Sequence, residues 1–377
     1  MSRNFLQNQV KTAHVMVVGC GALGNEVLKN LVLMGVEHLV VVDFDIVEMG
    51  NLTRSVLFRK EDAEAQRLKV DVVAERLAEI NSAIEVKTIC GDVAYDVGLG
   101  LVRRMDVVIG CVDSRWARYC INRLCMRANK PWVDGGISDL EGTARVFVPG
   151  INCYACNLGP EGRKDLARRL PCSGIIHRHE MVGSAPTTSI VASIIGAVQV
   201  QEALKLIHQD TLKAGELTSL CGKMFYYEGE HLTMKMADYQ AFDDECAEHT
   251  CWEPVQLCDM TLSVTVEDAL AILSYTLNAN DVAICLSGDS YVDYVSERSN
   301  DRRTEVMLPA RKVEAFVEQH PHLRGILMSE FYQHEYHRVD KTFPYQSLSL
   351  GELGIPVWDI LHVLADGRDY YFEMSKV

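Results

Sequence analysis

Short apolar runs alternate with helix-like segments along the first 150 residues of the chain. The apolar runs are typical of β-strands, and the segments between them have helical periodicity. Strands are expected at residues 14–19, 38–43, 84–90, 105–113 and 131–136, and helices at 25–35, 69–80 and 116–129. This order predicts a doubly wound, mostly parallel Rossmann-like α/β sheet, because parallel neighbours need long crossover connections.

A polar, cysteine-bearing segment interrupts this pattern from Ile151 to about Ala185, and loops of this length are uncommon without a function. A long helix is expected next, because residues 186–188 form a good N-terminal cap with a proline in the first turn. The helix is strongly apolar but contains Gln199 and Glu202. We therefore interpret it as a buried helix.

Two strands joined at Gly229 are expected within residues 219–236, and the composition changes from about Leu257. Short helices (268–277, 310–319) and strands (281–287, 360–366) are expected in the remainder, which is long enough for a separate, smaller α/β domain. The predicted domains are residues 1–255, with a crossover loop at about 157–185, and residues 256–377.

Charge, the first residues and the cysteine content exclude several classes of protein. A formal net charge of −15 argues against a general nucleic-acid binder, which needs an excess of Lys and Arg on one face. The first residues lack the apolar core of a signal peptide, and no apolar run reaches the ~20 residues of a membrane span. Thirteen cysteines without an export signal are typical of reduced thiols. We expect a cytoplasmic protein without membrane or nucleic-acid partners.

A glycine turn follows the first expected strand. Gly19, Gly21 and Gly24 fit G-x-G-x-x-G between a strand and a helix, and Asp43 ends the next strand. Unpaired N–H groups at a helix N-terminus favour an anion such as a nucleotide phosphate. A nicotinamide-dependent dehydrogenase would begin in the same way. The turn therefore predicts that a nucleotide binds here, but it does not identify the reaction.

The polar residues that follow favour phosphate chemistry. Asn51, Arg54 and Lys69 come after Asp43 in an ordered set. Activation of a triphosphate requires cations that gain interaction as pyrophosphate leaves, whereas hydride transfer does not. Asp113 ends a later strand, where a carboxylate is placed to hold Mg²⁺ with phosphate oxygens.

Six segments together match a known pattern: GCGALGNEVLKNLVLMGV, DFDIVEMGNLTRSVLFR, RLKVDVVAERLAEIN, CVDSRWARYCINRLC, PWVDGG and QVQEALKLI. Over roughly residues 3–235 the chain resembles the ubiquitin-activating-type adenylating enzymes, which include the bacterial sulfur-carrier adenylyltransferases of thiamine and molybdopterin synthesis. The resemblance is to a bacterial member with an added C-terminal domain. It implies a homodimer that adenylates the C-terminal glycine carboxylate of a ubiquitin-like carrier protein.

The resemblance also implies which residues bind ATP and Mg²⁺: Gly21, Asp43, Asn51, Arg54, Lys69 and Asp113. Gly19, Gly24 and Asp45 complete the predicted nucleotide site, in which Arg54 and Asp113 assist catalysis. The spacing from Arg54 to Lys69 is longer than the family's pattern, which leaves Lys60 as a rival. Arg3 is a weak match to the family's phosphate-contacting arginine.

Two cysteine-bearing segments predict a structural zinc site. Cys153 and Cys156 form C-x-x-C, which places two thiolates on one tight turn. Cys246 repeats this spacing with His249, or pairs with Cys251 as the fourth ligand. The family typically uses four cysteines, so the histidine is a departure. A redox pair or two buried thiols is the alternative interpretation of the C-x-x-C.

Cys172 is the candidate nucleophile. Arg168 and Arg169 precede it and His177 and His179 follow it, and cationic neighbours lower a thiol's pKa. Its position resembles that of the thioester- or persulfide-forming cysteine of relatives. The alternative is an inert, half-buried thiol.

Residues 345–363 resemble the end of the ubiquitin-fold domain with which activating enzymes recruit a conjugating enzyme, although Leu348, Leu350, Leu353 and Ile355 fit a core equally well. We therefore expect carrier adenylation, thioester formation on Cys172 and transfer to a conjugating enzyme. A sulfur-carrier adenylyltransferase would not need the added domain. A non-catalytic scaffold would lack the ATP-site residues.

Overall fold

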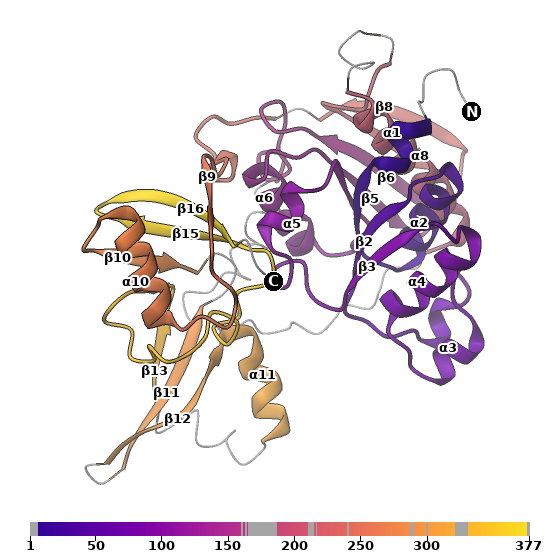
Figure 1. The fold of residues 1–377 in the computed structure, drawn as a ribbon. Helices are drawn as coiled ribbons and strands as arrows, with labels where there is room; N and C mark the ends of the chain where they lie inside the picture. The colour runs from indigo at the N-terminus through magenta and orange to yellow at the C-terminus, as the bar shows by residue number, and fades with distance from the viewer. Residues whose placement is uncertain are drawn as a thin grey trace. The chain divides into compact units, whose positions relative to one another are not determined.

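A computed structural model of the protein describes residues 7–159, 161–162, 164, 187–209, 215, 217–239, 241–286, 290–298, 301–320 and 331–374. The chain forms two compact units (Figure 1). The first unit contains the described residues of 7–159 and 187–251, and the second contains residues 161, 162 and 164 together with the described residues of 252–374.

An eight-stranded sheet forms the centre of the first unit, in the order β3-β2-β1-β4-β5-β6-β7-β8. The strands are β1 (His14–Val18), β2 (His38–Val42), β3 (Glu85–Ile89), β4 (Val107–Gly110), β5 (Trp132–Ser138), β6 (Glu141–Phe147), β7 (Lys223–Glu228) and β8 (Thr233–Asp238). β1 to β5 run parallel, and β6 to β8 extend the sheet antiparallel. This arrangement confirms the predicted doubly wound, mostly parallel fold.

Helices cover both faces of this sheet (Figure 1). They are α1 (Gln7–Thr12), α2 (Ala22–Met34), α3 (Lys60–Glu64), α4 (Lys69–Ile80), α5 (Leu99–Arg103), α6 (Arg115–Arg127) and α8 (Ser189–Ile207), with 3₁₀ turns η1 (Met49–Asn51) and η2 (Ala247–His249). α2 packs against α4 and α8 on one face, and α5 packs against α6 on the other. The larger core lies under α2, α4 and α8, where Leu28, Leu77 and Leu204 meet the strand valines.

α8 is long and apolar enough to span a membrane by length and composition alone. It nevertheless packs against α2 and strands β4, β5 and β6. Two of its polar residues are buried and bonded: Gln199 Nε2 donates to the Gly110 carbonyl (2.9 Å), and Glu202 Oε2 accepts from the Leu220 N–H (2.7 Å). The interpretation as a buried helix is confirmed, as is an N-terminal cap, where Thr188 Oγ1 accepts from the Val191 N–H. Pro186, which was expected in the first turn, lies outside the described residues.

The second unit contains a five-stranded sheet, β14-β10-β15-β16-β9, and a three-stranded sheet, β12-β11-β13. The strands are β9 (Val255–Cys258), β10 (Val282–Cys285), β11 (Tyr291–Arg298), β12 (Asp301–Pro309), β13 (Phe331–Tyr336), β14 (Arg338–Val339), β15 (Ile360–Ala365) and β16 (Arg368–Met374); the helices are α10 (Val266–Leu277) and α11 (Ala310–Gln319). Among the strands described in this unit, only β16 and β9 pair in parallel, so these two sheets are mostly antiparallel.

α10 packs its buried leucines into the core of the larger sheet, and Leu350 and Leu353 are buried in the same core. Leu348 and Ile355 are partly buried against it. These four residues therefore belong to the hydrophobic core, as one of the two interpretations of the sequence expected. The ubiquitin-fold interpretation of this unit stays a prediction.

Candidate functional site

The glycine turn between β1 and α2 is closely packed at two of its three glycines. Gly19 has a φ of +98°, and a Cβ there would lie 2.5 Å from the Cys111 carbonyl oxygen. A Cβ on Gly24 would lie 1.9 Å from the Gly19 carbonyl oxygen. At Gly21 an added Cβ would meet no atom within 4 Å. The turn is therefore open at Gly21, where α2 begins and its N–H groups face a potential anion.

Asp43 joins the end of β2 to this turn. Its Oδ2 accepts a hydrogen bond from the Cys20 N–H (2.6 Å), and its Oδ1 accepts one from the Asp45 N–H (2.9 Å). Burial raises the pKa of Asp43, against the lowering effects of Lys69 and of both N–H groups. The carboxylate thus sets the position of the turn relative to the strand edge.

Lys69 reaches the same edge from the start of α4. Its Nζ lies 2.7 Å from Oδ2 of Asp45, and its side chain is only 10% exposed. The Lys69 N–H also donates to the Asp45 carbonyl (3.0 Å). The rival Lys60 is exposed and pairs with Glu64 on α3 (3.0 Å). The structure therefore brings together Asp43, Asp45 and Lys69, and it does not place Lys60 with them.

The other predicted ATP ligands lie on flanking loops. Asn51 Oδ1 accepts a hydrogen bond from the Glu48 N–H (3.0 Å) within the turn at η1. Arg54 is half-buried, and its guanidinium forms no ion pair within the described part of the chain. Asp113 is exposed beyond β4, directly before Ser114, whose Oγ caps α6 by accepting from the Ala117 N–H (3.0 Å). Their roles in ATP and Mg²⁺ binding stay predictions.

Asn25 is a positioning residue that the sequence interpretation missed. It is fully buried, and its Nδ2 donates to the carbonyls of Cys20 (2.7 Å) and Gly21 (3.0 Å). Its Oδ1 accepts from the Leu57 N–H (2.9 Å). One amide therefore connects the glycine turn to the segment that carries Arg54. The available signal was an asparagine directly after the third glycine, in a helix whose buried residues are mostly apolar.

Asp134 is a second buried polar residue that was missed. It lies on β5 opposite Gly110 of β4 and is fully buried. Its Oδ1 accepts from Arg118 Nε (2.9 Å), and its Oδ2 pairs with Arg145. Because Arg118 belongs to α6, this network fixes the helix that begins just after Asp113. In the described part of the chain, Asp134 therefore stabilises the position of α6 relative to the sheet.

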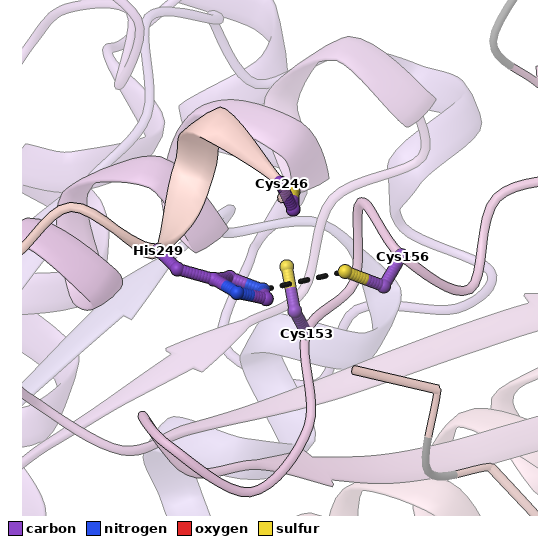
Figure 2. A group of neighbouring side chains, drawn as sticks. All are labelled: Cys153, Cys156, Cys246 and His249. Atoms are coloured by element: carbon purple, nitrogen blue, oxygen red, sulfur yellow. Dashed lines mark hydrogen bonds between the residues drawn. The ribbon is translucent and has the colours of Figure 1, made fainter. Parts of the chain in front are cut away.

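The four predicted metal ligands form one cluster. The ligand atoms of Cys153, Cys156, Cys246 and His249 all lie within 4.8 Å of one another. Figure 2 shows the two cysteines of the C-x-x-C turn facing Cys246 and the His249 ring, whose Nε2 lies 3.3 Å from Cys156 Sγ. Cys251 lies outside the cluster, exposed, with its Sγ 3.6 Å from the Arg127 carbonyl.

The chemistry of this cluster suits a tetrahedral metal ion. Thiolates around zinc lie about 3.8 Å apart, so the observed spacing needs little adjustment. Burial lowers the pKa of His249, which favours the neutral imidazole that binds metals. Its Nδ1 is buried without a hydrogen-bond partner in the described residues, and its ring stacks on Phe242. Three sulfurs and one imidazole therefore fit a structural zinc, which would join the loop after β6 to η2.

The candidate nucleophile, its four cationic neighbours in the sequence and Arg3 cannot be placed. Cys172 and Arg3 lie outside the described residues, as does most of the expected crossover loop.

Comparisons with known proteins agree with this architecture. The model of the ThiF family matches residues 3–248, and the chain belongs to this family. The SAMP-activating enzyme E1 of Haloferax volcanii is 30% identical over 238 residues, which are 63% of this chain and 81% of that protein. The adenylyltransferase and sulfurtransferase MOCS3 of Sus scrofa is 32% identical over 201 residues, which are 53% of this chain and 41% of that protein.

The fold also resembles a solved structure. The crystal structure of E. coli MccB with succinimide has a TM-score of 0.51 and 23% identity, and the likeness covers 65% of this chain and 68% of that one. The chain spans about half the length of the MOCS3 relatives that it matches. The predicted family resemblance is confirmed for the first unit.

Proposed function

We propose that the protein is an ATP-dependent adenylyltransferase that activates the C-terminal glycine carboxylate of a ubiquitin-like or sulfur-carrier protein. The observation that carries the proposal is the position of Lys69, which lies against Asp45 at the open glycine turn. Membership of the ThiF family supports it, as do relatives named as an adenylyltransferase and as an activating enzyme.

The proposed reaction transfers AMP to the carrier. A carboxylate oxygen attacks the α-phosphorus of ATP, the bond to the bridging oxygen breaks, and pyrophosphate leaves. The N–H groups at Gly21 and the start of α2 would bind phosphate, while Lys69 and Arg54 would stabilise the charge that develops on the leaving group. Mg²⁺, held by Asp113 and phosphate oxygens, would supply further charge neutralisation.

Two features favour a finer proposal. Cys172 stands among cationic residues in the sequence, and a second folded unit follows the adenylation unit. On this hypothesis the carrier passes from AMP to the Cys172 thiolate as a thioester and then to a conjugating enzyme recruited by residues 256–377. A homodimer in the cytoplasm, with a structural zinc in each chain, completes the proposal. The sulfur-carrier reaction is the alternative, since it also begins with adenylation.

The test is ATP–pyrophosphate exchange with a candidate carrier that ends in an exposed glycine. Exchange should require Mg²⁺ and the free C-terminal carboxylate, and a carrier whose terminus is amidated should give none. Non-reducing electrophoresis of the same mixtures reports a thiol-sensitive adduct. Exchange with no adduct would favour sulfur-carrier activation. Binding of the carrier without exchange would favour a non-catalytic scaffold, and binding of a nicotinamide cofactor in place of ATP would favour a dehydrogenase.

A further inference from the structure

Asn122 contacts the metal cluster without belonging to its ligands. Its side chain is fully buried on α6. Its Nδ2 donates a hydrogen bond to Sγ of Cys153 (3.3 Å), and its Oδ1 accepts one from the Tyr154 N–H (3.0 Å). A single amide therefore contacts both the first sulfur of the C-x-x-C turn and the peptide group that follows it.

We propose that Asn122 is a positioning residue that holds the Cys153 sulfur in its ligating place through these two hydrogen bonds. Groups that orient metal ligands in this way contribute to metal affinity, and replacing one typically weakens it by about 10- to 100-fold. The inference rests on the metal site proposed above.

The two hydrogen bonds determine which side chain is suitable. Because Oδ1 must face the Tyr154 N–H, the orientation of the amide is set, and the NH₂ group is directed at the sulfur. An aspartate would keep the acceptor but place an anion beside a thiolate. An alanine would leave the buried Tyr154 N–H without its acceptor, which is costly.

α6 contacts both halves of the cluster. Asn122 contacts the loop after β6, and three residues earlier on the same helix Tyr119 donates to Glu248 Oε1 (2.5 Å) in η2. The Tyr119 contact involves no metal ligand. Tyr119→Phe is therefore a matched control, because it loosens the same helix from the other half of the cluster without touching a sulfur.

The experiment compares the full-length wild type with Asn122→Asp, Asn122→Ala and Tyr119→Phe. Zinc affinity is measured by competition with a chromogenic chelator, and the absorption spectrum is recorded after loading with Co²⁺. The Asn122 variants should bind zinc roughly 10- to 100-fold more weakly. Their sulfur-to-cobalt charge-transfer band should move to longer wavelength, because a thiolate without its N–H donor releases electrons more easily. Tyr119→Phe should keep the wild-type band.

The position of the charge-transfer band separates a specific contact with the sulfur from a general loosening of the fold. If Asn122→Asp does not fold, the uncharged Asn122→Ala variant still provides the test. Wild-type affinity and band position in both Asn122 variants would overturn the role of Asn122 alone. A wild type that binds neither zinc nor cobalt would overturn the metal site together with this inference. It would not affect the adenylation proposal, which is tested by pyrophosphate exchange.

Discussion

The Nζ of Lys69 lies 2.7 Å from Oδ2 of Asp45, across an isolated bridge between Ile46 and Leu68 that joins two loops. This contact presents a largely buried ammonium group beside the glycine turn. Lys60, the rival in sequence spacing, is exposed on α3 and pairs with Glu64. The two lysines therefore make a matched pair of variants.

We expect Lys69→Met to reduce pyrophosphate exchange by roughly 10²- to 10³-fold, the loss typical when one group that stabilises developing charge is removed. Lys60→Met should retain wild-type exchange, because an exposed lysine in a surface pair contributes little. Initial rates at saturating ATP and carrier measure both effects. A larger loss in the Lys60 variant would show that the wrong lysine has been assigned.

Asn25 should contribute both to ATP affinity and to the free energy of unfolding. Asn25→Ala removes the acceptor of the buried Leu57 N–H and the donor to Cys20 and Gly21, so unfolding free energy should fall by about 1–3 kcal/mol. ATP affinity should fall as well, since the turn and the Arg54 segment lose their connection. Urea unfolding and ATP titration measure these effects. Asn30→Ala on the same helix serves as the control, and equal effects in both variants would remove the special role of Asn25.

Asp113 should determine the Mg²⁺ requirement. Asp113→Asn keeps the size of the side chain and removes its charge, so the Mg²⁺ concentration for half-maximal exchange should rise while the fold is unchanged. Exposed Asp281 in the second unit, changed to Asn, controls for the loss of one negative charge. An unchanged Mg²⁺ profile in the Asp113 variant would mean that this carboxylate does not hold the metal.

Replacing His249 and replacing Cys251 should have different effects on the metal content. Wild type and Cys251→Ala should each hold one zinc per chain, whereas His249→Ala should lose metal, because His249 faces the cluster and Cys251 faces the Arg127 carbonyl. Metal analysis after extensive dialysis measures the content. Thermal unfolding should show a lower midpoint in the His249 variant, since metal binding stabilises the folded state. A metal-free wild type that is fully folded and active would rule out the site.

Periodicity was sufficient to predict the parallel strands of the large sheet, because β1, β2, β4 and β5 contain short apolar runs next to helical segments. β3 mixes apolar and polar residues but also lies between two helical segments. β6 was missed, since Glu141–Phe147 mixes polar, glycine and apolar residues and follows β5 through a two-residue turn. β9, β11 to β14 and β16 were missed as well, because none of them is a clear apolar run: β11, β13 and β16 mix polar and aromatic residues, β12 begins with charged residues, and β9 and β14 are very short.

Motif spacing located the metal cluster but could not choose its fourth ligand. His249 and Cys251 are both compatible with a turn near Cys246, and only the path of η2 directs one of them inward. Spacing likewise could not find Asn25 or Asn122. Both act through hydrogen bonds between segments far apart in sequence, and a buried amide on a helix has no periodic signature.

Cys172 distinguishes the two enzymatic hypotheses. Adenylate formation needs positioning and charge stabilisation and uses no protein nucleophile, so Lys69, Arg54 and Asp113 with Mg²⁺ would suffice for it. Capture of the carrier as a thioester needs a reactive thiolate that reaches the acyl carbon. The candidate zinc ligands would be committed to the metal, and burial raises the pKa of Cys20, Cys111, Cys120 and Cys125.

We therefore expect Cys172→Ala to leave pyrophosphate exchange nearly intact while abolishing the thiol-sensitive adduct and transfer to a conjugating enzyme. Cys90→Ala is the control, because Cys90 is an exposed cysteine outside the metal cluster and should not affect the adduct. Exchange assays and non-reducing electrophoresis on the same samples separate the two steps. An adduct that persists without Cys172 would place the nucleophile elsewhere. A wild type that makes adenylate but never an adduct would make sulfur-carrier activation the stronger hypothesis, because that reaction does not require a carrier thioester on the enzyme.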